Sequence, residues 1–224
     1  MFELYLDTAD AEKVAVLNES LPVYGVTTNP SILAKAGLGV NQVLPALAAV
    51  LGGQPRFHVQ VVSETAAAMF EEALRLDALP YDIVVKVPAT RTGLAAIKEM
   101  KAAGITVLAT AIYSVQQGFL AALCGADYLA PYVNRIDAMG ANGVAVVANL
   151  QSLLKQQSLA TKLLPASFKN TQQVMDILQL GVASITLPVE IAEQMMAHPA
   201  VQPAVDQFTQ DWQARFGSKL AAES

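Results

Sequence analysis

The chain has 224 residues, of which 54% are hydrophobic and only 15% charged, and its formal net charge at pH 7 is −5. This composition excludes an intrinsically disordered chain, and the lack of a basic block argues against binding to nucleic acid or to an anionic membrane surface. The single cysteine excludes an internal disulfide and fits a reducing compartment. We therefore expect one soluble cytoplasmic domain, in the size range that α/β barrels often occupy.

One long uncharged stretch has the length of a membrane span. No charged residue lies between Lys101 and Asp127. Glycine, threonine, serine and glutamine interrupt this stretch, so a strand over 105–110 followed by a short buried helix explains it better. The amino-terminal segment MFELYLDTAD contains acids and lacks a basic region, so we expect no signal peptide.

Short runs rich in Val, Ile and Leu alternate along the chain with longer, Ala-rich stretches of helical period. This alternation predicts parallel strands joined by helical crossovers, and eight such pairs indicate a single (β/α)₈ TIM barrel over residues 1–224. An extra C-terminal helix is predicted over 203–216, around Trp212, and we expect it to cover a barrel mouth or to reach a neighbouring subunit. The predicted strands are 3–6, 23–27, 57–62, 83–87, 106–109, 128–130, 162–166 and 184–187, and the predicted barrel helices are 10–17, 42–51, 64–76, 92–103, 114–123, 143–156, 171–179 and 188–196.

Nearly every polar side chain in or just after a predicted strand falls at the same end of that strand. Barrel enzymes place their reactive groups at the carboxyl ends of the strands, so we expect these side chains to face one mouth of the barrel. In chain order they are Asp7, Thr27, Thr28, Asn29, Gln60, Lys86, Thr110, Tyr132, Arg135 and Ser167.

Lys86 is the most unusual of these residues, because it lies in the valine-rich run IVVKVP. The pleat places Val84 and Lys86 on one face of a central parallel strand that is covered on both sides, so the amine is expected to lie away from water. Desolvation lowers the pKa of a lysine, which suits a nucleophile that attacks a carbonyl at neutral pH. Taken alone, a lysine in such a run is more often one that extends to solvent from a strand end or a buried ion-pair partner.

The remaining candidates are less specific. Asp7 either caps the turn after its strand or handles protons, and Tyr132 and Gln60 fit ordinary packing. His58 shares a strand face with Gln60, one step deeper, where we expect an interior histidine with satisfied hydrogen bonds. Cys124 is expected to be a small buried side chain. Two distant histidines and one cysteine give no metal-ligand spacing, and no glycine-rich nucleotide motif is present, so neither a metal nor a cofactor is predicted.

Five segments, GVTTNPSI, IVVKVPAT, LATAIYS, APYVNRID and LPASFK, resemble the motifs of the short transaldolase-like class I aldolases. The resemblance runs from LYLDTAD to FTQDWQARFG. It implies a (β/α)₈ barrel in which Lys86 forms a Schiff base with a dihydroxyacetone-type donor, without a metal. It also implies rings of five subunits stacked into decamers, with the last helix crossing to a neighbour.

The resemblance further implies a role for each polar residue. The tyrosine is the acid/base and acts with a water held by the glutamine and a threonine. An arginine and a serine hold the phosphate of the acceptor, and the guanidinium suits that task because it can bind two phosphate oxygens at once. The matching residues are Tyr132 as acid/base; Gln60 and Thr110 for the water; Asp7 and Asn29 for substrate hydroxyls and lysine orientation; Thr27 for the donor; and Arg135 and Ser167 for the phosphate.

Two positions favour an aldolase over a transaldolase within this family. Transaldolases carry Glu where this chain has Gln60 and Phe where it has Tyr132, and the tyrosine hydroxyl offers a second proton-handling group beside the water. The implied reaction is reversible cleavage of fructose 6-phosphate to dihydroxyacetone and glyceraldehyde 3-phosphate. Alternatives are a transaldolase that transfers a dihydroxyacetone unit between sugar phosphates, a non-catalytic barrel that binds sugar phosphates, and a metal-dependent aldolase. The chain departs from the family at Ala109, where glycine is usual, and at His58, where an apolar residue is usual.

Overall fold

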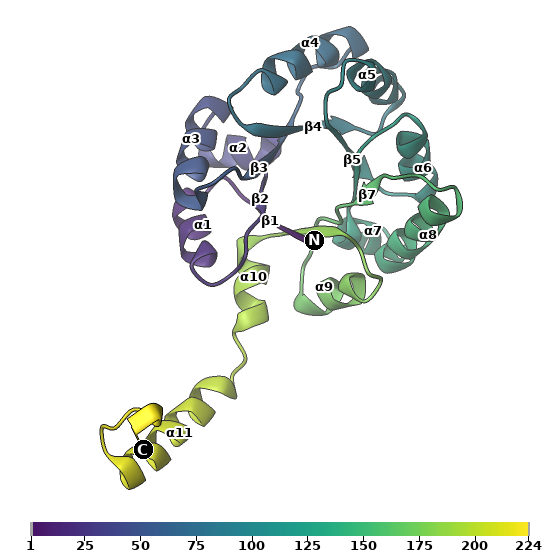
Figure 1. Ribbon diagram of the computed structural model, residues 1–224. Coiled ribbons are helices and arrows are strands. Elements are labelled where there is room, and N and C mark those ends of the chain that lie inside the picture. Colours follow the sequence, from purple (N-terminus) through teal and green to yellow (C-terminus); the bar gives the residue numbers. More distant parts are fainter. Residues whose placement is uncertain (1, 224) are drawn as a thin grey trace.

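The computed structural model describes residues 2–223 and forms a ring of eight parallel strands surrounded by helices (Figure 1). The predicted (β/α)₈ barrel with an extra C-terminal helix is confirmed. The strands are β1 (Glu3–Asp7), β2 (Gly25–Thr27), β3 (Arg56–Gln60), β4 (Asp82–Pro88), β5 (Val107–Ile112), β6 (Tyr128–Pro131), β7 (Lys162–Leu163) and β8 (Ser184–Leu187). The helices are α1 (Ala11–Asn18), α2 (Pro30–Ala36), α3 (Val40–Leu51), α4 (Ala66–Asp77), α5 (Arg91–Ala102), α6 (Val115–Leu123), α7 (Val133–Ala138), α8 (Gly143–Gln156), α9 (Thr171–Leu178), α10 (Val189–Met196), α11 (Val201–Phe216) and the 3₁₀ turn η1 (Ala221–Glu223).

The strands follow one another in chain order around the sheet, with β1 next to β8. The ring closes between β7 and β8 through a few specific bonds. The Ser184 hydroxyl donates to the carbonyl of Leu163 at 2.8 Å, and the amide of Thr186 donates to the carbonyl of Pro165 at 3.1 Å. These bonds join the two ends of the strand order, and the nearly closed ring directs alternate side chains of the strands into the barrel interior.

Local sequence explains why the helices begin so soon after the strands. Many helices start at a polar residue whose side chain accepts a hydrogen bond from a backbone amide of the first turn, which satisfies one of the free donors there. Because the cap fixes the start of the helix, the loop that leads into each of these capped helices has a well-defined end. These caps are Asp10, Asn29, Thr65, Thr90, Ser114, Asn142 and Asn170.

Buried apolar side chains form two separate clusters. The larger one lies between the strands and the helices and includes Val85, Ile97 and Leu150. The smaller one fills the barrel interior and consists of Tyr5, Val84, Leu108, Tyr128, Ala130 and Leu164. Because β4 contributes Val85 to the first cluster and Val84 to the second, the valine-rich run around Lys86 is explained by burial on both faces of the strand.

The eight predicted strands and the helices that follow them are all present, with shifted ends. Strand β7 is much shorter than the predicted 162–166, since Pro165 has no amide hydrogen to donate to a ladder. The sequence did not predict α2 or α7. Each is at most seven residues long, which is too short for a helical period to stand out from the loop that carries it.

Helix α11 extends away from the barrel instead of covering its mouth (Figure 1). None of its residues is buried. Its apolar side chains include Val201, Val205 and Phe208, which are 54%, 46% and 69% exposed. The extra helix therefore leaves an apolar surface that its own barrel does not cover.

Within residues 2–223, no single helix is long and apolar enough to cross a membrane. One pair of helices bent by 88°, α2 with α3, meets the length and composition criteria together.

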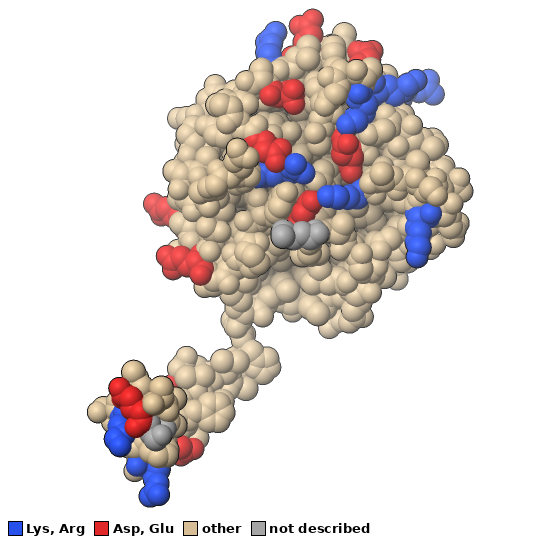
Figure 2. Space-filling view, in the orientation of Figure 1, with Lys and Arg blue, Asp and Glu red and all other residues tan. Residues whose placement is uncertain are grey.

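A hydrogen-bonded network of polar side chains closes the barrel at the end where the strands begin. The Glu3 carboxylate accepts bonds from the hydroxyls of Tyr5 and Tyr128 at 2.9 and 3.0 Å and from the amine of Lys162 at 2.6 Å. Arg56 Nη1 donates to the Tyr128 hydroxyl at 2.7 Å. Acidic and basic side chains gather near the centre of this face (Figure 2). Burial acts to raise the pKa of Glu3, but the bonds from Lys162, Tyr5 and Tyr128 together lower it.

Replacing Glu3 with Ala is expected to destabilise the barrel, since two buried tyrosine hydroxyls then lose their acceptor. We expect the free energy of unfolding in urea to fall by about 2 kcal/mol or more. The matched control is Glu71→Ala, whose carboxylate is 72% exposed and whose loss should change stability by less than about 0.5 kcal/mol. Equal effects of the two substitutions would show that the network contributes nothing beyond a surface charge.

Candidate active site

The polar residues at the carboxyl ends of the strands lie at one mouth of the barrel. The strand register places Asp7 beside Thr27, and Gln60 beside Lys86. Thr110 lies in β5 and Tyr132 directly follows β6. The fold thus brings together residues that are far apart in the chain, as parallel strands in a barrel require.

Lys86 is buried near the centre of this group and is only 5% exposed. Its amine donates a hydrogen bond to the backbone carbonyl of Thr28 at 2.6 Å, and it has no carboxylate at ion-pair distance in the described part of the chain. Lys86 therefore neither extends to solvent nor forms a buried ion pair, and both of these alternative interpretations are wrong. Burial lowers the pKa of Lys86, and the more distant charge of Asp7 opposes this shift. An amine in such surroundings loses its proton more easily and can act as a nucleophile.

Asp7 belongs to a short chain of hydrogen bonds. The Thr27 hydroxyl donates to Asp7 Oδ1 at 2.6 Å, so the 2.7 Å contact between Thr27 and Thr186 is a bond that Thr186 donates. Thr186 was missed in the sequence, although it occupies the end of the last strand and is 2% exposed. The pattern that indicated the other candidates, a polar residue near the carboxyl end of an apolar strand, also fits Thr186.

Tyr132 and Thr110 form a second polar pair, with 2.7 Å between their hydroxyl oxygens. Burial raises the pKa of Tyr132, and the bond with Thr110 and the charge of Arg135 partly offset this. Tyr132 is therefore protonated at neutral pH and can donate its proton. The guanidinium carbon of Arg135 lies 4.7 Å from the centre of the Tyr132 ring, an arrangement that favours a cation over an aromatic face.

Two backbone positions near Tyr132, one at the irregular end of β5 and one in the loop after β7, have unusual conformations. Ala111 and Ser167 have positive φ angles of 56° and 64°, a region that residues with a side chain rarely adopt. The carbonyl of Ser167 accepts a bond from the amide of Asn134 at 2.7 Å, which ties the loop after β7 to the start of α7. Strained backbone of this kind is concentrated at functional sites.

Three of the predicted residues make no short side-chain bond to another predicted site residue. Asn29 uses its side-chain oxygen to cap α2, accepting from the amide of Ile32 at 3.0 Å, so it has a structural role as well. Gln60 makes no side-chain hydrogen bond within residues 2–223. Arg135 Nη1 approaches the hydroxyl of Tyr113 at 3.5 Å, and this contact raises the pKa of Arg135 further.

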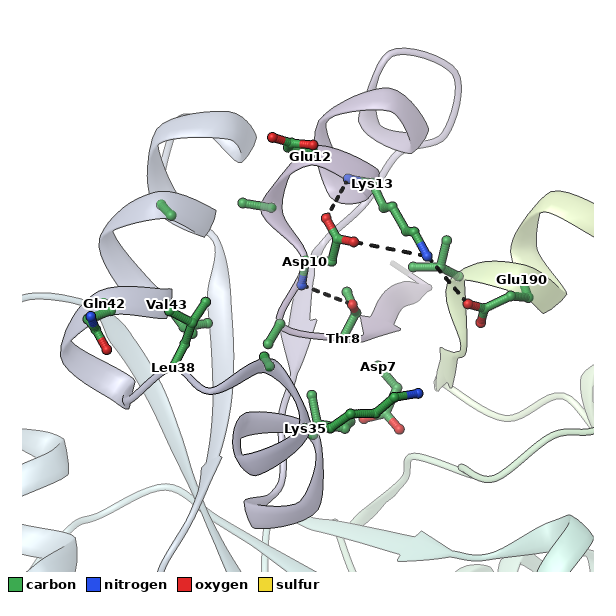
Figure 3. A pocket seen from close by; sticks show the side chains of 16 residues that line it. Asp7, Thr8, Asp10, Glu12, Lys13, Lys35, Leu38, Gln42, Val43 and Glu190 are labelled. Carbon is green, nitrogen blue, oxygen red and sulfur yellow. Dashed lines mark hydrogen bonds and ion pairs between the residues drawn. The ribbon is translucent and has the colours of Figure 1, made fainter.

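A groove of about 550 Å³ opens beside Asp7, between α1, α2, α3 and α10 (Figure 3). Lys13 lies between Asp10 and Glu190 at 4.0 and 3.6 Å. Lys35 reaches the same groove from α2 and has no ion pair in the described chain. Asp7, at the carboxyl end of β1, is one of the residues that line this groove.

Two expectations about less prominent residues need correction. Neither ring nitrogen of His58 has a hydrogen-bond partner within residues 2–223, although the ring is fully buried. The prediction of satisfied hydrogen bonds is wrong, because the ring packs edge-on against Tyr5 and Tyr128, whose hydroxyls are bonded to Glu3 instead. Cys124 is only partly buried, since it ends α6 near the surface. In the same described range, no three His, Cys, Asp or Glu side chains come together to hold a metal ion.

Residues 4–223 match the family described as Transaldolase/Fructose-6-phosphate aldolase. The chain belongs to this family. It is an enzyme family of the aldolase and transaldolase type, and its match covers nearly the whole barrel.

Solved structures resemble this chain at the level of the fold. A mandelate oxidase variant with a monooxide FMN adduct has a TM-score of 0.58 at 17% identity and covers 97% of this chain and 74% of that one. A putative isomerase from Sinorhizobium meliloti has a TM-score of 0.61 at 12% identity and covers 86% of this chain and 53% of that one. A flavocytochrome b2 variant with bound sulfite has a TM-score of 0.59 at 10% identity and covers 84% of this chain and 56% of that one. The chain spans about half the length of the last two, and all three share only the barrel architecture with it.

His58→Phe is expected to stabilise the protein, because it replaces an unpaired buried polar ring with an apolar one. The free energy of unfolding at pH 7 should rise by about 1–3 kcal/mol. Burial, with the charges of Lys86 and Arg56, holds the pKa of His58 well below 6.5 in the folded state. The unfolded chain therefore takes up a proton below pH 6.5 that the native state does not, and wild-type stability falls by up to about 1.4 kcal/mol per pH unit from this residue.

The measurement is urea unfolding of wild type and variant between pH 7 and pH 5. The variant should lack that part of the pH dependence. The control is His198→Gln, at an exposed position, which should leave stability within about 0.5 kcal/mol of wild type. A loss of stability in His58→Phe at pH 7 would contradict the argument.

Proposed function

We propose that this protein is a class I aldolase that cleaves fructose 6-phosphate reversibly to dihydroxyacetone and glyceraldehyde 3-phosphate, through a Schiff base on Lys86. The observation that carries the proposal is the buried Lys86 amine, bonded to a carbonyl and surrounded by the polar strand ends. Family membership supports a reaction of this type. The same chemistry also allows aldol addition of dihydroxyacetone-type donors to aldehydes.

The proposed steps follow from the surroundings of Lys86. The neutral amine attacks the C2 carbonyl of the sugar, water leaves, and the imine retains a proton and a positive charge. The C4 hydroxyl then loses its proton, the C3–C4 bond breaks, and its electron pair moves into the imine to give an enamine and glyceraldehyde 3-phosphate. Protonation at C3 and hydrolysis of the regenerated imine release dihydroxyacetone and restore Lys86.

We assign the proton transfers to Tyr132 and to a water that Gln60 and Thr110 would hold. Tyr132 is protonated at neutral pH because burial raises its pKa, so it can supply the proton that converts the enamine into the releasable imine. A proton supplied there favours release of dihydroxyacetone over transfer to a second sugar. Gln60 and Tyr132 thus support the aldolase over the transaldolase.

Substrate recognition is assigned to both sides of Lys86. On the donor side, Asp7, Thr27 and Asn29 would bind the hydroxyls of the dihydroxyacetone unit. On the acceptor side, Arg135 and Ser167 would bind the phosphate, since a guanidinium can donate two parallel bonds to phosphate oxygens.

We also propose that the protein forms a homo-oligomer in the cytoplasm. The apolar side chains of α11 face away from their own barrel, and a second copy of the chain is the partner that would cover them. This surface is consistent with pentamer rings or a decamer.

The Schiff base is tested by borohydride reduction in the presence of dihydroxyacetone, followed by peptide mapping. We expect a single adduct on the peptide that contains Lys86, unaffected by a chelator, because no metal takes part in the proposed steps. The control is Lys98→Met, which removes an exposed lysine and should leave the adduct in place. An adduct on another lysine, or activity lost with EDTA, would contradict the mechanism.

The role of Tyr132 is tested with Tyr132→Phe. We expect kcat for fructose 6-phosphate cleavage to fall about 100-fold, as for removal of a general acid, while adduct formation on Lys86 stays near the wild-type level. The matched control is Tyr81→Phe, in the loop before β4, which should leave kcat unchanged.

Equal loss of cleavage and adduct in Tyr132→Phe would count against the assigned role. An assay without an acceptor separates the two family activities. Wild type should release free dihydroxyacetone, whereas efficient transfer to erythrose 4-phosphate with no release would support the transaldolase instead.

A further inference from the structure

His58 is the one fully buried side chain in the described part of the chain whose polar atoms lack any hydrogen-bond partner. Its ring is held between those of Tyr5 and Tyr128, at centroid distances of 4.7 and 5.3 Å and interplanar angles of 85° and 81°. An unpaired polar group in a dry interior destabilises the fold. Departures of this kind from ordinary packing are typical of functional positions.

The position of His58 relates it directly to the proposed site. His58 lies two residues before Gln60 on β3, so both side chains point into the barrel. The register sets Gln60 opposite Lys86 and His58 opposite Val84, which places the imidazole one step beneath the amine. Tyr5 lies two residues before Asp7 on β1 and has the same relation to that carboxylate. His58 and Tyr5 therefore form the floor of the site.

The floor is rigid because Tyr5 and Tyr128, the two tyrosines that hold the His58 ring, are fixed from below. Both hydroxyls donate to the Glu3 carboxylate, which also accepts from Lys162. The imidazole therefore has little freedom to turn away from the site above it.

The charges around His58 keep its ring neutral. Burial is the largest cause of its low pKa, and the positive charges of Lys86 above and Arg56 below add to it. A neutral imidazole has one nitrogen with a free lone pair, and cations attract that lone pair. Arg56 is already bonded to Asp82 and Tyr128, whereas the amine of Lys86 has only the carbonyl of Thr28. When the Lys86 nitrogen carries a positive charge, as ammonium or as protonated imine, it can therefore still accept the support of a further lone pair.

We propose that His58 is a positioning residue for the Schiff-base step, which stabilises positive charge on the Lys86 nitrogen through the lone pair of its neutral ring. The inference rests on the proposed function. The imine must keep its proton to withdraw electrons from the breaking bond, and a lone pair beneath it favours that protonated form. The same interaction favours the ammonium form of the free lysine, though less than burial opposes it.

The test compares wild type with His58→Phe, which keeps an aromatic ring and removes both nitrogens, and with His58→Gln, which keeps an acceptor. For each protein, kcat and kcat/KM for fructose 6-phosphate cleavage are measured against pH, with the fraction of Lys86 trapped by borohydride at a fixed dihydroxyacetone concentration. In His58→Phe we expect the trapped fraction and kcat/KM at pH 7 to fall about tenfold, because positive charge on the Lys86 nitrogen then loses the nearby lone pair, to which the free amine is not hydrogen-bonded.

The pH profile separates this role from packing. Without the lone pair, both the free ammonium and the protonated imine lose support. The acid limb of kcat/KM and the alkaline limb of kcat should then both move down by about one pH unit, which is the shift that a tenfold change in proton affinity gives. His58→Gln should restore part of both shifts. Phe57→Leu, on the opposite face of the same strand, should leave both limbs in place.

Each outcome decides between the possibilities. A folded His58→Phe protein that is more stable but has wild-type limbs and trapping would overturn this inference and leave His58 as packing alone. If His58→Phe does not fold, His58→Leu, which also removes both ring nitrogens, takes its place: shifted limbs in His58→Leu would support a lone-pair role, and wild-type limbs would overturn it. If wild type itself forms no adduct on Lys86, the proposed function fails and this inference fails with it.

Discussion

The burial of one amine inside the barrel is the constraint on which the rest of the structure depends. Lys86 is 5% exposed, and an ammonium group taken out of water is strongly disfavoured. In the proposed mechanism that penalty makes the amine reactive, and it exists only while the barrel is closed and its interior filled. Closure by Ser184 and Thr186 between β7 and β8, and the cluster of Tyr5, Val84 and their neighbours, therefore support the chemistry as much as the fold.

The polar groups around the amine are oriented by one another before any substrate arrives. Thr27 joins Asp7 to Thr186, and Thr110 holds the hydroxyl of Tyr132. Asp7, Thr27, Thr186 and Thr110 lie in four different strands, and Tyr132 directly follows β6, so the sheet fixes the geometry of these bonds. Such preorganisation lowers the reorganisation needed when charge develops during a reaction.

The two ends of the barrel use polar groups differently. At the end where the strands begin, Glu3 satisfies two tyrosines and Lys162 in a closed network, and the network serves stability. At the other end several polar groups remain open to a substrate. His58 lies between the two ends of the barrel, and neither of its ring nitrogens is hydrogen-bonded. An apolar ring would pack at this interior position without leaving a polar group unpaired.

The sequence by itself determined the order of strands and helices, the barrel and the candidate lysine, because hydrophobic period and a charge within a valine run are local features. It missed α2 and α7, whose six or seven residues carry no clear period. It also missed Thr186, the bond from Lys86 to Thr28, and the unpaired state of His58. Those features depend on register and ring closure, which join residues as distant in the chain as Thr27 and Thr186, 159 positions apart, and only the tertiary structure decided them.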